Sequence, residues 1–117
     1  NLFAKILRGE IPCRKVFENE YVLAFYDINP RRKVHILVIP KGPYRHFSDF
    51  STQASPEEIV SFFKAIGEIV GKYQLDETGY RLITNQNQHG GQEIPHFHIH
   101  ILGGEPVGPL VSNKSCL

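Results

Sequence analysis

The sequence predicts an α+β domain built around an antiparallel sheet. The expected elements follow one another as a short helix, three strands, a long helix and two strands, with turn residues between most neighbours. The chain has 117 residues, of which 41% are hydrophobic and 21% charged, and these values are typical of one globular domain. We therefore expect a single domain over residues 1–117, without an internal repeat or a linker.

The first half of the chain predicts one helix followed by three strands. Apolar residues recur at helical spacing over residues 2–7. Residues 14–18 and 21–27 have the composition and spacing of a hairpin. Residues 35–39 form a β-branched apolar run that stops at Pro40, which is typical of a strand.

The longest expected element is a helix from Pro56 to Tyr73. Ser55 and Glu58 have the spacing of a capping box, and Pro56 stands at the first helical position. One apolar stripe then runs along the helix, made of Ile59, Phe62, Phe63, Ile66, Ile69, Val70 and Tyr73. Such a stripe indicates a helix that packs against the core and carries no chemistry.

Two strands are expected after this helix, over residues 80–84 and 96–102. A polar loop over residues 85–95 separates them, and Gly103-Gly104 ends the second strand. The strand order along the chain favours antiparallel pairing, because no helix follows each strand as it would in a parallel sheet.

Charge, cysteine content and the length of apolar runs exclude several classes of protein. The formal net charge is +1, so no strong field favours nucleic acid or an anionic membrane as a partner. Two cysteines far apart in the sequence provide neither a disulfide framework nor a zinc pattern. Apolar runs are much shorter than the ~20 residues of a membrane span, and NLFAKILRGEIPC lacks the apolar region of a signal peptide. We expect a cytoplasmic protein.

The most informative stretch is PHFHIHILGG, residues 95–104, which holds three of the six histidines. Alternate residues of a strand share one face, so His96, His98 and His100 point one way while the apolar residues between them point into the core. Successive histidines on that face lie roughly 6.5–7 Å apart. The pattern predicts a row of imidazoles on an exposed or cleft-lining surface.

Three interpretations of this row are open from the residues alone. It could be the solvated face of a half-buried strand, although three histidines in register would serve no purpose there. Two of them could bind zinc with His35 as a third ligand, but the row has no cysteine and no obvious carboxylate behind it. One imidazole could act as a nucleophile while the others supply protons and phosphate contacts. We favour catalysis.

The row resembles the signature of the histidine-triad (HIT) superfamily, His-φ-His-φ-His-φ-φ with φ apolar, which HFHIHIL matches at every position. FAKILRGEIPCRKVFENEYVLAFYDINPRRKVHILVIPK resembles the N-terminal half of the Hint branch, the histidine-triad nucleotide-binding proteins. NQNQHGGQEIPHFHIHILGG resembles the catalytic end of that branch. The resemblance spans about residues 2–108 and is closest in form to bacterial members.

The resemblance implies a HIT fold, an antiparallel five-stranded sheet with one long helix and a short N-terminal helix, paired as a homodimer. It also implies hydrolysis of purine nucleoside 5′-phosphoramidates, with AMP or GMP released from an amine and with no cofactor and no metal. Two alternatives stay open. One is a dinucleoside polyphosphate hydrolase of the same superfamily, and the other is a nucleotide-binding regulatory module with incidental hydrolysis.

The resemblance assigns roles to four histidines. His98 matches the nucleophile that forms a nucleotidyl-histidine intermediate, with its other nitrogen held by a backbone carbonyl. His100 matches the residue that contacts the phosphate and the atom bridging to the leaving group. His96 and His35 match a buried supporting pair behind the nucleophile, and the alternative for His35 is a satisfied core histidine at the start of a strand.

The resemblance also assigns nucleotide-binding residues. Asp27 matches the carboxylate that binds both ribose hydroxyls, although it could be a turn residue before Asn29-Pro30. Asn85 matches a phosphate-side amide, and the segment ending at Gln92 could offer backbone N–H groups to phosphate oxygens. An apolar slot around the purine is matched by Leu2, Phe3, Ile6, Phe25 and Ile28, which by composition alone are simply core residues.

Glu93 departs from the family pattern, which usually has a small hydroxyl residue at this position. An ionised glutamate cannot donate a hydrogen bond and would repel a phosphate. Either its side chain turns to solvent, or the site prefers cationic leaving groups such as a lysine amine.

Overall fold

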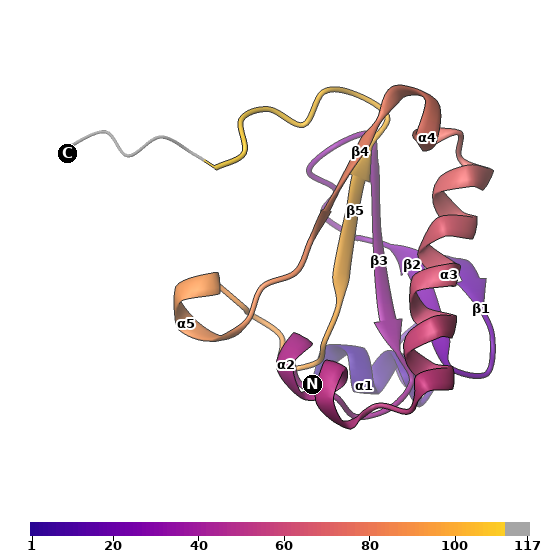
Figure 1. Cartoon of the computed structure of the whole chain (residues 1–117), viewed down its shortest axis with the longest axis vertical. Coiled ribbons are helices and arrows are strands. Elements are labelled where there is room, and N and C mark those ends of the chain that lie inside the picture. Colours follow the sequence, from indigo (N-terminus) through magenta and orange to yellow (C-terminus); the bar gives the residue numbers. More distant parts are fainter. Residues whose placement is uncertain (112–117) are drawn as a thin grey trace.

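The computed structural model describes residues 1–111, which form one five-stranded antiparallel sheet (Figure 1). The strands are β1 (Lys15–Glu18), β2 (Val22–Tyr26), β3 (Val34–Pro40), β4 (Tyr80–Ile83) and β5 (Ile99–Gly103). Their order across the sheet is β1-β2-β3-β5-β4, so the last strand of the chain lies between β3 and β4. This order makes His35 on β3 and His100 on β5 neighbours, although 65 positions separate them in the sequence.

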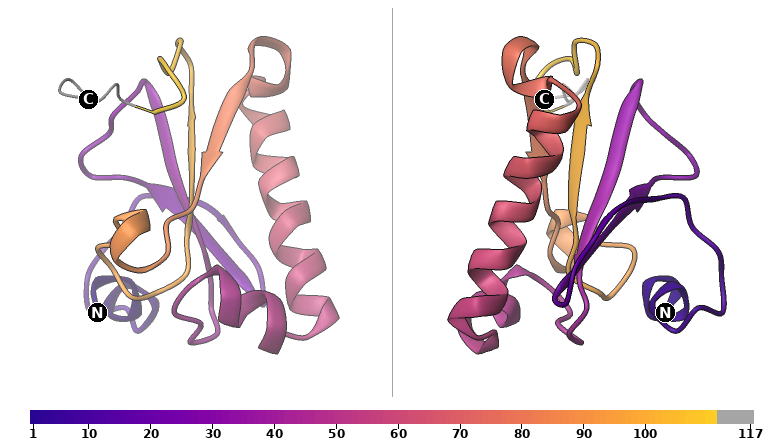
Figure 2. Two further views of the ribbon diagram at one scale, coloured as in Figure 1. Left: turned by 60° about the vertical axis from the view of Figure 1, so that its left-hand side comes forward. Right: turned by 90° about the vertical axis from the view of Figure 1, so that its right-hand side faces the viewer.

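Two helices cover opposite faces of the sheet (Figure 2). α3 (Pro56–Lys72) packs along one face, and α1 (Leu2–Leu7) lies on the other. Side chains of β2 alternate between these faces, as expected of a strand. Val22 and Ala24 belong to the apolar cluster under α3, and Leu23 and Phe25 belong to the cluster under α1. The sheet is therefore buried on both faces, and the side that carries α1 is the side of the histidines.

The long helix begins and ends within one residue of its predicted bounds. The Ser55 hydroxyl accepts a hydrogen bond from the Glu58 N–H, and the Glu58 carboxylate accepts one from the Ser55 N–H. The hydroxyl of Tyr44 also donates to that carboxylate at 2.9 Å, which ties the start of α3 to the loop after β3. No helix within residues 1–111 combines the length and the apolar composition needed to cross a membrane.

Three short helices occupy segments for which no helix was predicted: α2 (Phe47–Gln53), α4 (Leu75–Thr78) and α5 (Asn87–Gly90). α2 is capped by the imidazole of His46, which is not a residue type that usually marks a helix start. α4 and α5 are each four residues long. Gln74, just before α4, and Asn87, the first residue of α5, both have a left-handed backbone conformation. Single turns are too short to show the apolar periodicity that predicts a helix.

The last strand begins at Ile99, so the predicted strand over residues 96–102 was placed too early. The register of β3 and β5 pairs Val38 with Ile99 and, if continued by two more pairs, would bring Pro40 opposite Phe97. Proline has no N–H to donate to the ladder, and the Phe97 N–H donates instead to the carbonyl of Tyr44 at 2.7 Å. The alternation survives without the ladder, since Phe97 still packs in the cluster under α3.

Candidate active site

A pocket of about 420 Å³ opens on the α1 side of the sheet. Its volume suits a small organic ligand. The pocket brings together most of the predicted site residues: Leu2, Phe3, Ile6, Phe25, Asp27, Ile28, His35, Asn85, Glu93, His98 and His100. His96 and Gln92 are the two predicted site residues that do not line it.

Aromatic rings form an apolar wall of the pocket. Phe3 of α1 packs edge-on against Phe25 of β2 with a centroid separation of 5.7 Å, and both rings are buried. Ile28 stands at the opposite extreme, 85% exposed in the loop after β2. A flat heterocycle that enters here would contact the two aromatic rings on the inner side of the pocket and the aliphatic side chain of Ile28 at the rim.

His98 has one ring nitrogen committed to the main chain. Its Nδ1 lies 2.7 Å from the carbonyl oxygen of His96, which is the contact that the resemblance implies. A carbonyl oxygen only accepts hydrogen bonds, so Nδ1 carries the proton of the neutral ring and Nε2 carries a lone pair. Phe3 packs edge-on against this ring at 5.0 Å, and the Thr84 hydroxyl donates to the His98 carbonyl at 2.8 Å. These contacts hold the ring of His98 in a fixed orientation, with Nε2 free of the main-chain contact.

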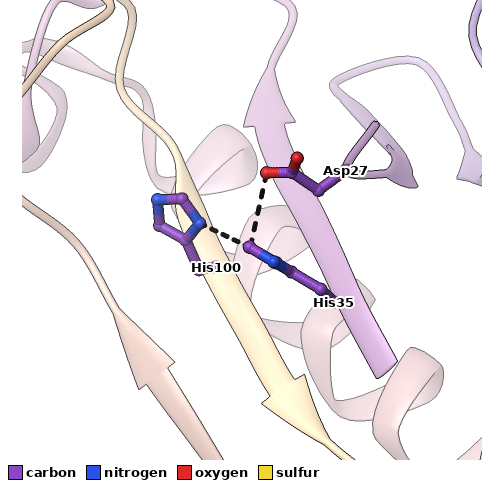
Figure 3. Close-up of side chains that lie close together, drawn as sticks. All are labelled: Asp27, His35 and His100. Carbon is purple, nitrogen blue, oxygen red and sulfur yellow. Dashed lines mark hydrogen bonds and ion pairs between the residues drawn. The ribbon is translucent and has the colours of Figure 1, made fainter. Parts of the chain in front are cut away.

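His35 contacts His100, whereas the resemblance places it behind His98 (Figure 3). The Nε2 of His35 lies 2.9 Å from the Nδ1 of His100, and the same Nε2 lies 3.4 Å from the Oδ2 of Asp27. On its other side, the Nδ1 of His35 accepts a hydrogen bond from the main-chain N–H of Arg31 at 3.0 Å. His35 thus joins the turn after β2 to the last histidine of the row.

Burial lowers the pKa of each histidine in this cluster. It is the largest cause for His35, His96 and His98, and the carboxylate of Asp27 partly opposes it at His35 and His98. For His100, burial and then the neighbouring His98 and His35 lower the pKa from 6.5 to about 4. The rings are therefore neutral near pH 7, which leaves a lone pair available on His98.

Asp27 follows β2 and is held by the turn that it helps to form. Its main-chain N–H donates to the carbonyl of His35 at 3.0 Å, and its Oδ1 accepts the N–H of Asn29 at 2.8 Å. The carboxylate thus lies on the pocket wall with Oδ1 engaged and Oδ2 turned toward His35. A carboxylate held in this way can accept hydrogen bonds from ligand hydroxyls.

The two predicted residues outside the pocket make local contacts. The Nε2 of His96 donates to the carbonyl of Pro40 at 2.9 Å, so His96 bonds to the end of β3. The side chain of Gln92 donates to the carbonyls of Arg45 and Ile94. Both side chains thereby fix the loop that leads into the histidine row.

Other pocket residues were missed by the sequence analysis. They are Ile11, Pro12, Cys13, Tyr26, Asn29, Arg31, Leu37 and Ile94, whereas Gly91, also in the lining, belongs to the predicted segment that ends at Gln92. Arg31 is the most consequential, because its main-chain N–H bonds to His35. Arg31 is four residues after Asp27, which could have drawn attention to its side chain. A sequence, however, does not indicate the direction in which a main-chain N–H points.

Asp27, His35 and His100 also form a group in which one ligand-type atom from each residue lies within 4.8 Å of the others. The spacing suits a divalent cation, but the chemistry of His35 opposes one. A neutral histidine that binds metal through Nε2 carries its proton on Nδ1. That proton would face the N–H of Arg31, which already donates to Nδ1. The residues fit a hydrogen-bonded chain better than a metal site.

Comparison with known proteins identifies one family. The model of the HIT domain matches residues 8–107. An uncharacterized HIT-like protein from Azospirillum brasilense is 50% identical over 112 residues, which cover 96% of this chain and 92% of that protein. The purine nucleoside phosphoramidase of Escherichia coli is 40% identical over 113 residues, which cover 97% of this chain and 94% of the enzyme.

Solved structures agree with the sequence relatives. A histidine triad protein from Clostridium difficile superposes with a TM-score of 0.84 at 41% identity, covering 94% of this chain and 95% of its own. A HIT family hydrolase from Legionella pneumophila has a TM-score of 0.84 at 39% identity, covering 92% of this chain and 95% of its own. The similarity therefore extends over nearly the whole length of each partner in the comparison.

Proposed function

The chain belongs to the HIT domain family, and we propose that it is a purine nucleoside phosphoramidase that acts through a nucleotidyl-histidine intermediate on His98. The observation that carries the proposal is the 2.7 Å contact between the Nδ1 of His98 and the carbonyl of His96. It leaves the lone pair of the neutral ring on Nε2, in a histidine that lines the pocket. The 40% identity to the Escherichia coli phosphoramidase supports the choice of substrate.

The arrangement of the pocket supports a reaction in two steps. The Nε2 of His98 attacks phosphorus, the P–N bond to the amine breaks, and the amine leaves with a proton taken from the histidine cluster. Water then attacks the same phosphorus, the bond to Nε2 breaks, and a proton from water returns to the cluster. One phosphoramidate and one water thus become one amine and one nucleoside monophosphate, and the enzyme is unchanged.

The remaining pocket residues would bind the nucleotide. The slot formed by Phe3, Phe25 and the neighbouring aliphatic side chains would hold the purine. Asp27 would accept hydrogen bonds from the ribose hydroxyls, and Asn85 would face the phosphate. His100 lies beside His98, with ring centroids 5.0 Å apart, and would hydrogen-bond the phosphate or the bridging nitrogen.

Pairing of two copies through their sheets is part of the proposal. β4 is an edge strand, and it exposes Tyr80 and Leu82 at 41% and 40%. Unpaired edges with apolar side chains favour association with a second strand. Sedimentation velocity should show a dimer for the wild type and a shift toward monomer for Leu82→Lys. A monomeric wild type would contradict this part of the proposal.

Release of amine from adenosine 5′-phosphoramidate tests the reaction. We expect His98→Ala to lower kcat by about 10⁴- to 10⁶-fold, because it removes the nucleophile. His89→Ala is the matched control, since His89 is exposed on α5 and does not line the pocket. A chelator should leave the wild-type rate unchanged. Absence of turnover by the wild type, with AMP still bound, would favour a polyphosphate hydrolase or a regulatory module.

A further inference from the structure

The main-chain N–H of Arg31 determines which nitrogen of His35 carries a proton. An amide N–H can only donate, so the Nδ1 of His35, 3.0 Å away, must accept. The neutral ring then has its proton on Nε2. His35 is 4% exposed, and burial lowers its pKa more than the carboxylate of Asp27 raises it, so the neutral form is the relevant one.

This proton fixes the next ring in turn. The Nε2–H of His35 points to the Nδ1 of His100 at 2.9 Å, so that Nδ1 must accept the hydrogen bond (Figure 3). The neutral His100 therefore carries its own proton on Nε2. The Oδ2 of Asp27 lies 3.4 Å from the same Nε2 and favours a proton there, because a carboxylate is an acceptor.

His98 has the opposite tautomer. The carbonyl of His96 holds the proton of His98 on Nδ1, which leaves Nε2 as a lone pair. The two pocket rings are adjacent, with centroids 5.0 Å apart. We propose that His35 is a positioning residue that fixes the tautomer of His100, so that the pocket presents a lone pair on His98 and an N–H donor on His100.

The arrangement has a catalytic consequence that rests on the proposed function, whereas the tautomers themselves do not. A lone pair is needed where phosphorus is attacked, and an N–H is needed where charge develops on the oxygens or on the leaving nitrogen. If His100 presented a lone pair instead, it would repel those atoms. Loss of His35 should therefore lower kcat more than it raises KM.

The tautomers can be measured directly on the full chain without any ligand. Two-bond ¹H–¹⁵N correlation spectra of the histidine rings at neutral pH distinguish Nδ1–H from Nε2–H. We expect Nε2–H for His100 and Nδ1–H for His98. The exposed His89 gives an internal reference for a ring that exchanges between both forms. Observation of Nδ1–H on His100 in the wild type would overturn the proposal, and this result needs no variant to fold.

Two substitutions separate positioning from simple packing. His35→Leu keeps a side chain of similar volume but removes the N–H donor. The spectrum of His100 should then change to an averaged pattern like that of His89, and kcat should fall ~100-fold. His35→Gln keeps an N–H donor at the same reach, so it should retain the Nε2–H pattern and recover much of kcat. If the His35→Leu spectrum matches the wild type, His35 does not set the tautomer.

The spectra and the kinetics can fail independently. If the wild type shows the expected tautomers but does not hydrolyse a phosphoramidate, the proposed function is wrong and the positioning role of His35 stands. If it hydrolyses the substrate with His100 in the Nδ1–H form, the proposed function stands and the positioning role of His35 is wrong.

Discussion

At the scale of single residues, Glu93 is the feature of the pocket that should bias the choice of leaving group. It is exposed and, among the described residues, shares the pocket lining with only one other carboxylate, Asp27. A carboxylate beside the departing amine should attract a cationic group and repel an anionic one. Exposed charge pairs contribute little, so we expect a modest effect.

The comparison of two phosphoramidates tests this role. Glu93→Gln should lower the preference for a lysine amine over a neutral alkylamine by about 2- to 5-fold in kcat/KM, because the charge is removed at constant size. Glu20→Gln provides the control, since Glu20 is exposed in the turn between β1 and β2 and lies outside the pocket. An unchanged preference would mean that the Glu93 side chain turns to solvent.

The residues of the pocket were largely predictable, but their contacts were not. The resemblance selected His98, His100 and Asp27, and the structure places all three around one pocket. It did not predict that His35 bonds to His100, because that contact depends on which strands are neighbours in the sheet. Nor did it predict the role of Arg31, because a main-chain amide leaves no trace in residue identity.

At the scale of elements, the start of α3 is linked to the histidine row through a chain of contacts. Ser55 and Glu58 cap the helix, Glu58 accepts a hydrogen bond from Tyr44, and the carbonyl of Tyr44 accepts the N–H of Phe97. Phe97 lies between His96 and His98. The capping box therefore supports more than the first turn of its helix.

Removal of the cap should destabilise the protein measurably. Ser55→Ala deletes the hydroxyl that accepts the Glu58 N–H and should lower the free energy of unfolding by about 1 kcal/mol, as judged from urea denaturation. Ser51→Ala is the matched control, because Ser51 is an exposed serine inside α2 and alanine favours a helix interior. Equal losses in both variants would show that the capping box contributes nothing specific.

Long elements were predicted well because their patterns extend over many residues. The stripe of α3 repeats over several turns, and the strand over residues 35–39 is continuous, so both were confirmed. The start of β5 could not be predicted, because it depends on the register with β3, which would place Pro40 opposite Phe97 if the ladder continued. The helix α2 depends on a histidine cap, for which sequence rules have no strong preference.

At the scale of the whole molecule, folding keeps several histidines neutral, and this predicts sensitivity to acid. The pKa of His100 is 6.5 without perturbation and about 4 in the folded protein, and burial lowers the pKa of His35, His96 and His98 as well. Below pH 6.5 the unfolded chain binds protons that the folded chain does not, so the free energy of unfolding decreases. This contribution of His100 is complete above pH 6.5 and lost by about pH 4.

Urea unfolding between about pH 4 and pH 7.5 measures this dependence. His100→Gln should weaken the slope, because one proton fewer is taken up on unfolding. Carboxylates with a lowered pKa, such as Asp49 and Glu58, lose their contributions at lower pH, below their ordinary values of 3.8 and 4.5. A wild-type stability that stays constant between pH 6.5 and about pH 4 would contradict the prediction.

The hydrogen bond from the Arg31 amide to His35 also bears on how the protein can evolve. Nineteen of the twenty genetically encoded residues would supply the same N–H at this position, and only proline lacks it. The tautomers of His98 and His100 thus depend on the positions of main-chain groups and not on the side chain at position 31. This hydrogen bond alone would therefore tolerate any residue except proline at position 31, whereas an insertion or deletion in the turn after β2 would remove it.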